Sequence, residues 1–141
     1  KKPDSYNVQY NYKISDLNVY LGISQLDQLN QFVKKRKSIA GIYSKALNGS
    51  AKLPVLSKEN IFWRYVIKID KNPIDVIKEA TKYGIEIGRG VYPPLHQYLK
   101  INDELFKNTK KAISQLIALP IYPSLTDKEI NYLIKVLKKI L

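Results

Sequence analysis

The residue types that could build a binding site gather between residues 88 and 96. The only histidine of the chain, His96, follows the sequence Pro-Pro-Leu, and a loop histidine behind such a rigid corner is well placed to line a cleft. Arg89 lies between Gly88 and Gly90, which let the backbone approach a ligand closely, and its guanidinium can bind phosphate or carboxylate. Plainer interpretations stay open: a surface histidine without a role, and a bulged strand with a surface arginine.

Another candidate, Asn11, lies between two aromatic residues. Tyr10 and Tyr12 flank it, so its amide could make a polar contact between two rings. The plainer alternative is an ordinary strand or turn residue. None of these features is a strong motif by itself.

The composition excludes several kinds of site. The 141 residues contain no Cys, which rules out a disulfide framework, a thiolate zinc site and a cysteine nucleophile, and one His cannot form a His-rich metal site. The sequence has no Walker loop, no G-x-G-x-x-G and no H-E-x-x-H. The neighbouring carboxylates Asp103 and Glu104 would point in different directions on a helix. We therefore predict no catalytic residue and no metal ligand in this chain.

The chain carries a formal net charge of +12, from 24 Lys and Arg against 12 Asp and Glu. Such a charge suggests nucleic acid or an anionic ligand as a partner. However, only Arg36, Arg64 and Arg89 are arginines, and arginine is the residue that best reads bases and clamps phosphates. We interpret the basic run at 34–37 as a solvated helix face, which makes nucleic acid the less favoured partner. A stand-alone basic module that binds nucleic acid or another acidic partner remains the alternative function.

Simple features of the sequence predict the number of domains, the absence of a membrane helix and the kind of protein to which the chain belongs. One compact domain is the expectation for 141 residues. No apolar stretch reaches the roughly 20 residues that a membrane helix needs, so we expect no membrane partner. The chain begins Lys-Lys-Pro and contains no Met, from which we expect a piece of a longer, cytoplasmic protein.

The first third of the chain is expected to be helical after an extended start. Aromatic and polar residues alternate between 6 and 12, which is typical of an extended segment. Ser15 has the residue type of a helix N-cap, and helical spacing continues to residue 47, where Asn-Gly follows as a stop signal. Because the apolar stripe drifts between Leu26 and Arg36, we expect two helices or one bent helix.

The middle of the chain predicts a strand and then a helix. The β-prone run at 61–70 is typical of a buried strand. Asn72 and Pro73 are an N-cap followed by proline at the first helical position, and Gly84 is the expected end of that helix. Its inward side is expected to carry Ile74, Ile77, Ala80 and Thr81.

The last third is expected to contain a strand, a helix and a short extended link. Residues 85–91 predict a strand that the following Pro-Pro ends. A helix capped by Asn102 or Asp103 is expected to run through residue 117, and residues 121–123 to form the link.

A capping box predicts the start of a final helix. Thr126 and Glu129 have the spacing at which each side chain bonds the backbone of the other. The apolar stripe behind this cap is expected to consist of Ile130, Leu133, Ile134, Leu137 and Leu141.

This order of elements predicts an α+β fold. A small antiparallel or mixed sheet, covered by helices on one face, accommodates it. We expect a segment with long helices at 1–48 and a small α+β domain at 49–141.

Five stretches of the sequence, taken in order, have the form of family motifs. They are Tyr10-Asn11-Tyr12-Lys13-Ile14-Ser15-Asp16-Leu17 with Leu21-Gly22 and Gln25-Leu26, Lys35-Arg36-Lys37 with Ile39-Ala40 and Tyr43, residues 62–69, Gly84-Ile85 with Tyr92-Pro93-Pro94-Leu95-His96, and Leu119-Pro120-Ile121-Tyr122-Pro123-Ser124-Leu125-Thr126. These stretches resemble the motifs of the DegT/DnrJ/StrS family, which are pyridoxal-phosphate (PLP) sugar aminotransferases of fold type I. Together they cover nearly the whole chain, and their order and spacing make the resemblance specific.

The resemblance implies roles for individual residues. Asn11 would reach the PLP phosphate of the neighbouring subunit of a homodimer, and Lys13 stands where the family commonly has Arg. Tyr10, Tyr12 and Lys13 would flank this contact between the subunits. Arg89, Tyr92 and His96 would lie near the entrance used by the nucleotide-sugar substrate.

The implied function is that of the C-terminal part of a PLP-dependent aminotransferase that transfers an amino group from a donor to a nucleotide-linked keto-sugar. The family's large N-terminal domain carries the PLP lysine and most of the cofactor site, and its motifs are absent here. We therefore expect this chain to be inactive alone, and not to hold PLP by itself. A dehydratase relative within the family is also consistent with the resemblance.

Overall fold

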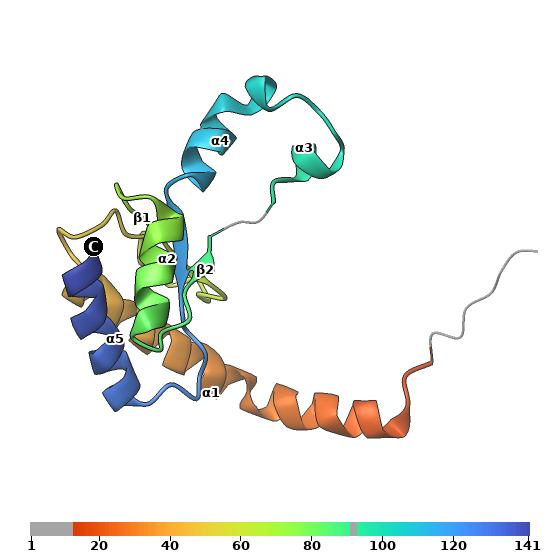
Figure 1. Cartoon of the computed structure of the whole chain (residues 1–141). Helices are drawn as coiled ribbons and strands as arrows, with labels where there is room; N and C mark the ends of the chain where they lie inside the picture. The colour runs from red at the N-terminus through yellow and green to blue at the C-terminus, as the bar shows by residue number, and fades with distance from the viewer. Residues whose placement is uncertain (1–12, 91–92) are drawn as a thin grey trace, which may run out of the picture. The chain divides into compact units, whose positions relative to one another are not determined.

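The computed structural model describes residues 13–90 and 93–141, and Figure 1 follows their elements along the chain. The helices are α1 (Asp16–Ala46), α2 (Pro73–Lys82), α3 (Leu95–Tyr98), α4 (Lys107–Ile113) and α5 (Asp127–Ile140), together with the 3₁₀ helix η1 (Asp103–Phe106). The strands are β1 (Tyr65–Lys68), β2 (Gly88–Arg89) and β3 (Leu116–Leu119).

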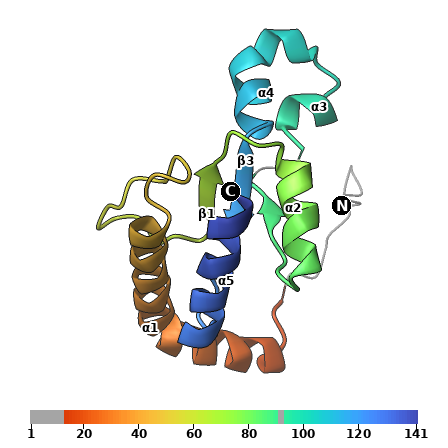
Figure 2. The ribbon, with the colours of Figure 1, turned by 60° about the vertical axis from the view of Figure 1, so that its left-hand side comes forward.

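These strands form an antiparallel sheet in the order β1-β3-β2. In the pairing of β1 with β3, Tyr65 lies opposite Leu119 and Ile67 opposite Ile117, and all four side chains are buried. The residues that alternate with them are only half-buried, so one face of the sheet is the core face. Helices α2 and α5 pack against each other and complete this core (Figure 2). The expected α+β class with a small antiparallel sheet is confirmed.

The central strand β3 is where the expected order of elements is wrong. Residues 116–119 were expected to end a helix, whereas they pair with β1 on one side and β2 on the other. The expected helix is instead η1 followed by the short α4, which ends at Ile113. A run of four apolar residues suits a strand or a buried helix turn equally well, and only its neighbours decide between them. The link at 121–123 is not a strand.

The other strands are shorter than expected. Strand β1 occupies four residues of the run 61–70, because Phe62 has a positive φ of 51° that an extended strand cannot contain. Strand β2 is limited to Gly88 and Arg89 of the expected 85–91.

The signals at helix ends are confirmed. The Oδ1 of Asn72 accepts a hydrogen bond from the amide of Ile74 at 2.9 Å, and Pro73 is the first helical residue of α2. The Oγ1 of Thr126 accepts from the amide of Glu129 at 3.2 Å, while the Glu129 carboxylate accepts from the amide of Thr126 at 2.8 Å. The apolar stripe of α5 faces the core, where its members Ile130, Leu133, Ile134, Leu137 and Leu141 are buried or packed against it.

The inward side expected for α2 is partly wrong. Val76 and Ala80 are buried and Ile77 is half-buried, whereas Ile74 and Thr81 are exposed. The buried side of α2 is thus turned by part of a helical turn from the predicted one. The sheet and α5 decide which side is buried, and the short sequence pattern does not specify their direction.

Helix α1 is assigned as one continuous helix from the expected N-cap, Ser15, whose Oγ accepts from the amide of Asn18 at 3.4 Å. In its second half Ile39, Ala40 and Tyr43 belong to the core. The phenol of Tyr43 donates to the carbonyl oxygen of Pro120 at 2.8 Å, and burial raises the pKa of that phenol.

By their contacts the residues fall into two compact units, Lys1–Asn30 and Gln31–Leu141. The division expected near residue 48 stays a prediction. Among the described helices, none is both long and apolar enough to cross a membrane.

Candidate functional site

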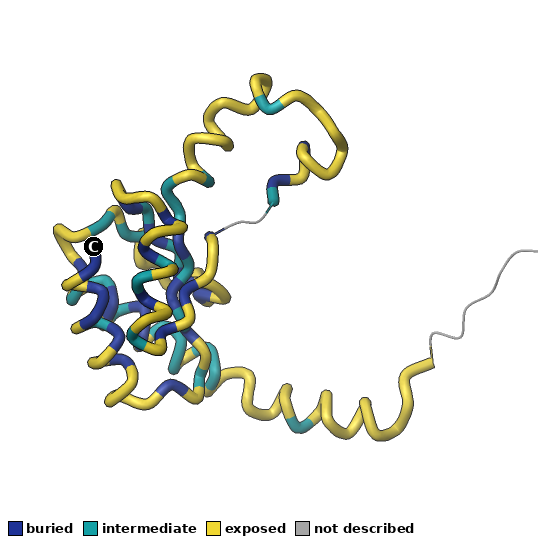
Figure 3. The backbone as a smooth tube through the Cα atoms, viewed as in Figure 1, coloured by how far each residue is buried: buried dark blue, intermediate teal, exposed yellow. Residues whose placement is uncertain are grey.

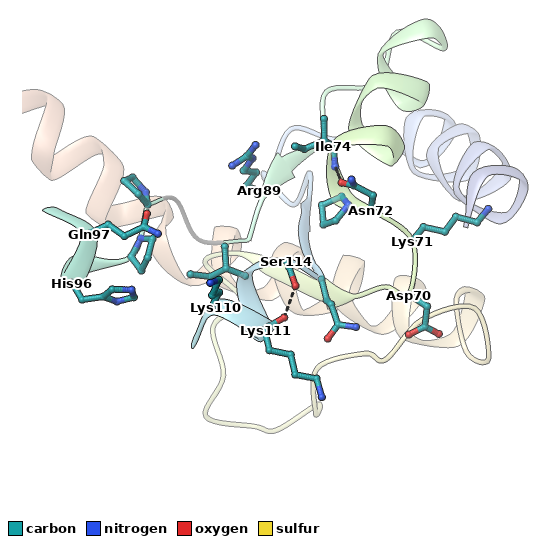
Figure 4. Close-up of a pocket in the computed structure, with 15 residues that line it drawn as sticks. Asp70, Lys71, Asn72, Ile74, Arg89, His96, Gln97, Lys110, Lys111 and Ser114 are labelled. Carbon is teal, nitrogen blue, oxygen red and sulfur yellow. Dashed lines mark hydrogen bonds between the residues drawn. The ribbon is translucent and has the colours of Figure 1, made fainter. Parts of the chain in front are cut away.

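A cleft of about 670 Å³ lies in the second unit, between the start of α2, strand β2 and the segment that joins β2 to β3. Figure 4 shows the side chains around it, with Arg89 on one side and Lys110 and Lys111 on another. The described residues that line it are Asp70, Lys71, Asn72, Pro73, Ile74, Arg89, Pro93, Pro94, His96, Gln97, Lys110, Lys111, Ile113, Ser114 and Gln115.

The charge of the cleft is predominantly positive. Arg89, Lys110 and Lys111 bring positive charges to its wall, against the one carboxylate of Asp70, while the Nζ of Lys71 donates to the carbonyl oxygen of Ile140 on α5. Such a concentration of cations in a concave surface favours an anionic ligand, because the low-dielectric walls strengthen the local field. The cleft is therefore suited to phosphate or carboxylate groups.

One wall of the cleft is held together by the only histidine. His96 is 7% exposed, and its Nε2 lies 2.8 Å from Oδ1 of Asp103. The Nε2 of Gln97 donates to both oxygens of the same carboxylate, each at 3.2 Å. The imidazole also stacks on the ring of Phe106, with centroids 4.4 Å apart. These contacts tie α3 to η1.

The same contacts act on the Asp103 carboxyl. Hydrogen bonds from Gln97 first, and then from His96, hold the pKa of Asp103 below its usual value. The Asp103 carboxylate therefore fixes the orientation of the His96 ring through Nε2.

Lys110 has a carboxylate partner of its own. Its Nζ lies 3.3 Å from Oε1 of Glu104, while Asp103 turns to His96. Asp103 and Glu104 thus point to different basic partners, as their adjacent positions predict.

The glycines beside Arg89 were expected to let the backbone approach a ligand closely. At Gly90 the close neighbours are instead side chains of the protein itself. A Cβ atom added at Gly90 would lie 2.7 Å from Cβ of Leu116 and 2.9 Å from Cγ1 of Val66. At Gly88 the nearest atom would be 3.9 Å away. Gly90 is thus required where β2 meets the rest of the sheet, and it places Arg89 at the cleft.

The structure brings together two of the residues singled out in the sequence. Arg89 and His96 both line the cleft. Lys13 is exposed and belongs to the first unit. The remaining candidates, Tyr10, Asn11, Tyr12 and Tyr92, lie outside the described residues.

Sequence reasoning missed several residues of the cleft. Nothing marks Lys110 and Lys111 among the other lysines of the sequence. Asp103, which is the partner of His96 and not itself a lining residue, carried the weak signal of lying seven residues after the only histidine. Gln115 was also missed. Its buried Oε1 accepts no hydrogen bond among the described residues, and a buried acceptor without a donor is costly.

The cleft does not fit the cofactor PLP by itself. The described lysines that line it are exposed, and none of the described lining residues is Phe, Tyr or Trp, so a flat ring would have no aromatic side chain to stack on. No step of cofactor chemistry is therefore assigned to these residues. Among the described residues there is likewise no group of three His, Cys, Asp or Glu side chains that could hold a metal ion.

Comparison with known proteins decides the family. The profile of the DegT/DnrJ/EryC1/StrS aminotransferase family matches residues 2–138. The chain belongs to this family. The resemblance seen in the sequence motifs is thereby confirmed.

Curated relatives of the family are much longer than this chain. The GDP-perosamine synthase of Caulobacter vibrioides is 25% identical over 146 residues, a match that covers 95% of this chain and 39% of the relative. The spore coat polysaccharide biosynthesis protein SpsC of Bacillus subtilis is 26% identical over 146 residues, covering 93% and 38%. The chain thus spans about two fifths of the length of these family members.

Solved structures of other proteins share the fold of this chain. DesV of S. venezuelae superposes with a TM-score of 0.82 at 17% identity, covering 99% of this chain and 40% of DesV. NtdA of Bacillus subtilis, solved with the cofactor PMP bound, gives a TM-score of 0.77 at 24% identity, covering 99% and 35%. The fold is therefore that of part of a fold type I sugar aminotransferase.

Proposed function

We propose that this chain is the C-terminal part of a PLP-dependent aminotransferase whose substrate is a nucleotide-linked keto-sugar. In this proposal the cleft binds the anionic nucleotide part of the substrate, and the cofactor with its lysine belongs to a large domain outside this chain. The amino donor and a second subunit of a homodimer are the other partners. As in the sequence-based expectation, the chain alone has no transaminase activity.

The observation that carries the proposal is the meeting of Arg89 and His96 at one basic cleft. The family resemblance implies that both residues contact the substrate. Arg89 offers a planar fork of N–H donors, which matches two oxygens of a phosphate. The cleft volume of about 670 Å³ lies within the range of small-molecule sites.

The described residues would bind and orient the substrate rather than perform the chemistry. Arg89, Lys110 and Lys111 neutralise phosphate charge, while the Pro93-Pro94 corner and His96 shape one wall. PLP, when bound in the large domain, supplies the electron sink for transfer of the amino group. The family match to GDP-perosamine synthases favours a nucleoside diphosphate as the anionic part.

The experiment is a titration of the chain with GDP and with UDP, followed by the amide NMR shifts of residues around the cleft. Arg89→Ala should weaken binding by about tenfold or more, because a hydrogen-bonded pair with a charged group is worth about 1.5–3 kcal/mol. Lys128→Ala is the matched control, since it removes the same charge from an exposed position at the start of α5, outside the cleft.

Three results would count against the proposal. Equal weakening by Arg89→Ala and Lys128→Ala would show binding by net charge alone. A short DNA duplex that binds with a steep salt dependence, where neither nucleotide binds, would favour the basic binding module instead. A visible absorption band that forms on adding PLP to the chain alone, and that depends on one lysine of the chain, would contradict the expected absence of the PLP lysine.

A further inference from the structure

The side chain of Gln115 differs from the others that line the cleft. Of the described residues, 13–90 and 93–141, it has the only buried side-chain oxygen or nitrogen without a hydrogen-bond partner, namely Oε1. Gln115 lies where the chain passes from the exposed α4 into the sheet, and Figure 3 shows this change from exposed to buried residues. A buried acceptor without a donor destabilises a fold, so its presence at a cleft points to a donor that the ligand brings.

The backbone of Gln115 is held on both sides. Its amide donates to the carbonyl oxygen of Ala112 at 3.0 Å, and its carbonyl oxygen accepts from the amide of Ile69 at 2.8 Å. The side chain therefore starts from a fixed point of the cleft wall, while its terminal amide can turn about χ3. Oε1 can thus meet a ligand without any movement of the backbone.

Two neighbouring donors of the cleft are used elsewhere. The hydroxyl of Ser114 donates to the carbonyl oxygen of Lys111 at 2.9 Å. The Nζ of Lys71 donates to the carbonyl oxygen of Ile140 at 2.8 Å. Neither donates to Gln115, although both residues line the cleft with it. The missing donor is therefore expected from the ligand.

The chemistry of a nucleoside diphosphate narrows the choice of donor. Its ionised phosphate oxygens only accept hydrogen bonds, so they suit Arg89, Lys110 and Lys111 but cannot satisfy Oε1 of Gln115. The donors of such a ligand are the ribose hydroxyls and the N–H groups of the base. The ribose is joined to the phosphates through a single CH₂ group, so it must lie beside them in the cleft.

The two polar atoms of the Gln115 amide match a pair of hydroxyls. Oε1 accepts and Nε2 donates, and the two atoms lie side by side. The 2′- and 3′-hydroxyls of ribose are also neighbours, and each can both donate and accept. One hydroxyl can therefore donate to Oε1 while the other accepts from Nε2, whereas 2′-deoxyribose retains only one of them.

We propose that Gln115 binds the 2′,3′-diol of the nucleotide and makes the cleft selective for ribonucleotides over 2′-deoxyribonucleotides. This inference rests on the proposed function, because it takes the nucleotide part of the substrate as the ligand of the cleft. A site built to bond a hydroxyl discriminates strongly against an analogue that lacks it, since the buried group of the site is then left unpaired. Gln115 determines specificity in this way and takes no part in the transfer of the amino group.

The first experiment compares GDP with 2′-deoxy-GDP by isothermal titration calorimetry of the chain. The two ligands have the same phosphates and the same base, so binding by net charge affects both equally. 2′-Deoxy-GDP should bind at least about tenfold more weakly. Gln115→Met, which keeps an unbranched side chain but has no amide, should bind GDP about tenfold more weakly than the parent and should bind both nucleotides equally.

Stability separates a binding role of Gln115 from a structural one. Gln115→Met removes a buried acceptor that has no partner, so its midpoint of urea unfolding should equal or exceed that of the parent chain. A residue kept for the fold would show the opposite sign. Gln31→Met is the matched control, since it makes the same change at an exposed position of α1 outside the cleft and should leave the preference for GDP unchanged.

The outcomes that overturn the proposal are distinct. Equal affinity of the parent chain for GDP and 2′-deoxy-GDP would refute it and leave the proposed function intact. A lower urea midpoint of Gln115→Met, with the preference for GDP retained, would assign the residue a structural role. Weaker binding of GDP methylated at N1 of guanine, with no effect of the 2′-hydroxyl, would place the base rather than the ribose at Gln115. Absence of binding by GDP and by UDP would refute the proposed function, and this inference with it.

Discussion

Replacing Gly90 by Ala tests how the sheet positions Arg89. Gly90 follows β2 directly, and its amide lies 3.4 Å from the carbonyl oxygen of Leu116 on β3. Its own carbonyl oxygen accepts from Arg64 at 3.3 Å. An added methyl group would meet Leu116 and Val66 at distances that real Cβ atoms do not show, 2.7 and 2.9 Å.

The expected cost follows from which atoms can move. The Cβ of Leu116 is attached to the backbone of the central strand, so no side-chain rotation relieves that contact, and β2 must shift away from β3. Overpacking of this kind costs about 1–3 kcal/mol. The loss of backbone freedom in the unfolded chain offsets it by about 0.4–1 kcal/mol. Gly90→Ala should therefore lower the free energy of unfolding by about 1–2 kcal/mol.

The assay is urea unfolding followed by circular dichroism, with Gly88→Ala as the matched control. The methyl group of that control would meet its nearest neighbour, Cβ of Ala118, at an ordinary 3.9 Å. Gly88→Ala should thus leave stability unchanged or raise it by about 0.5 kcal/mol. With a slope of about 1–3 kcal/mol per molar urea, the midpoint of Gly90→Ala should fall by about 0.5–1 M.

Equal midpoints for the two variants would show that the close approach at Gly90 has no energetic consequence. A fall in the slope with an unchanged midpoint would point instead to a change in the unfolded state. As a second readout, Gly90→Ala should also weaken GDP binding, because a shifted β2 carries Arg89 with it.

Two further predictions concern the segments around the cleft. The pKa of Asp103 is lowered in the folded protein by its bonds to Gln97 and His96, so its contribution to stability is present above the unfolded carboxyl pKa of about 4 and is lost as the pH falls through the lower folded value. Asp103→Asn should therefore be less stable than the parent at pH 6 and match it in strong acid, as measured by urea unfolding across that range; a constant difference at every pH would contradict this. Asn72→Ala should lower the free energy of unfolding by about 1 kcal/mol through loss of the α2 N-cap, whereas Asn72→Ser should retain most of it because serine also caps. Equal loss in the two Asn72 variants would assign the effect to the cleft rather than to the cap.

Structural features that are set by contacts between residues close together in the sequence could be predicted from the sequence. The N-caps at Asn72 and Thr126 are examples, and so is the end of α2 near Gly84, whose φ of +70° suits glycine. In each, the interacting groups lie within about four residues, so the energies that choose the local structure are readable from the sequence. The family motifs likewise identified Arg89 and His96 as site residues.

Features that depend on distant segments were decided by the tertiary structure. The apolar run at 116–119 became a strand because β1 and β2 were available to pair with it on its two sides. In the same way His96 required Asp103 to be brought back by the turn after α3.

The sequence by itself therefore determined the family, the caps and the class of the fold. Only the tertiary structure decided the central strand, the partner of His96 and the meeting of Arg89 with Lys110 and Lys111 at one cleft. The physical reason is that caps and periodicity are local interactions, whereas strand pairing and cleft electrostatics depend on residues that only the folded chain brings together.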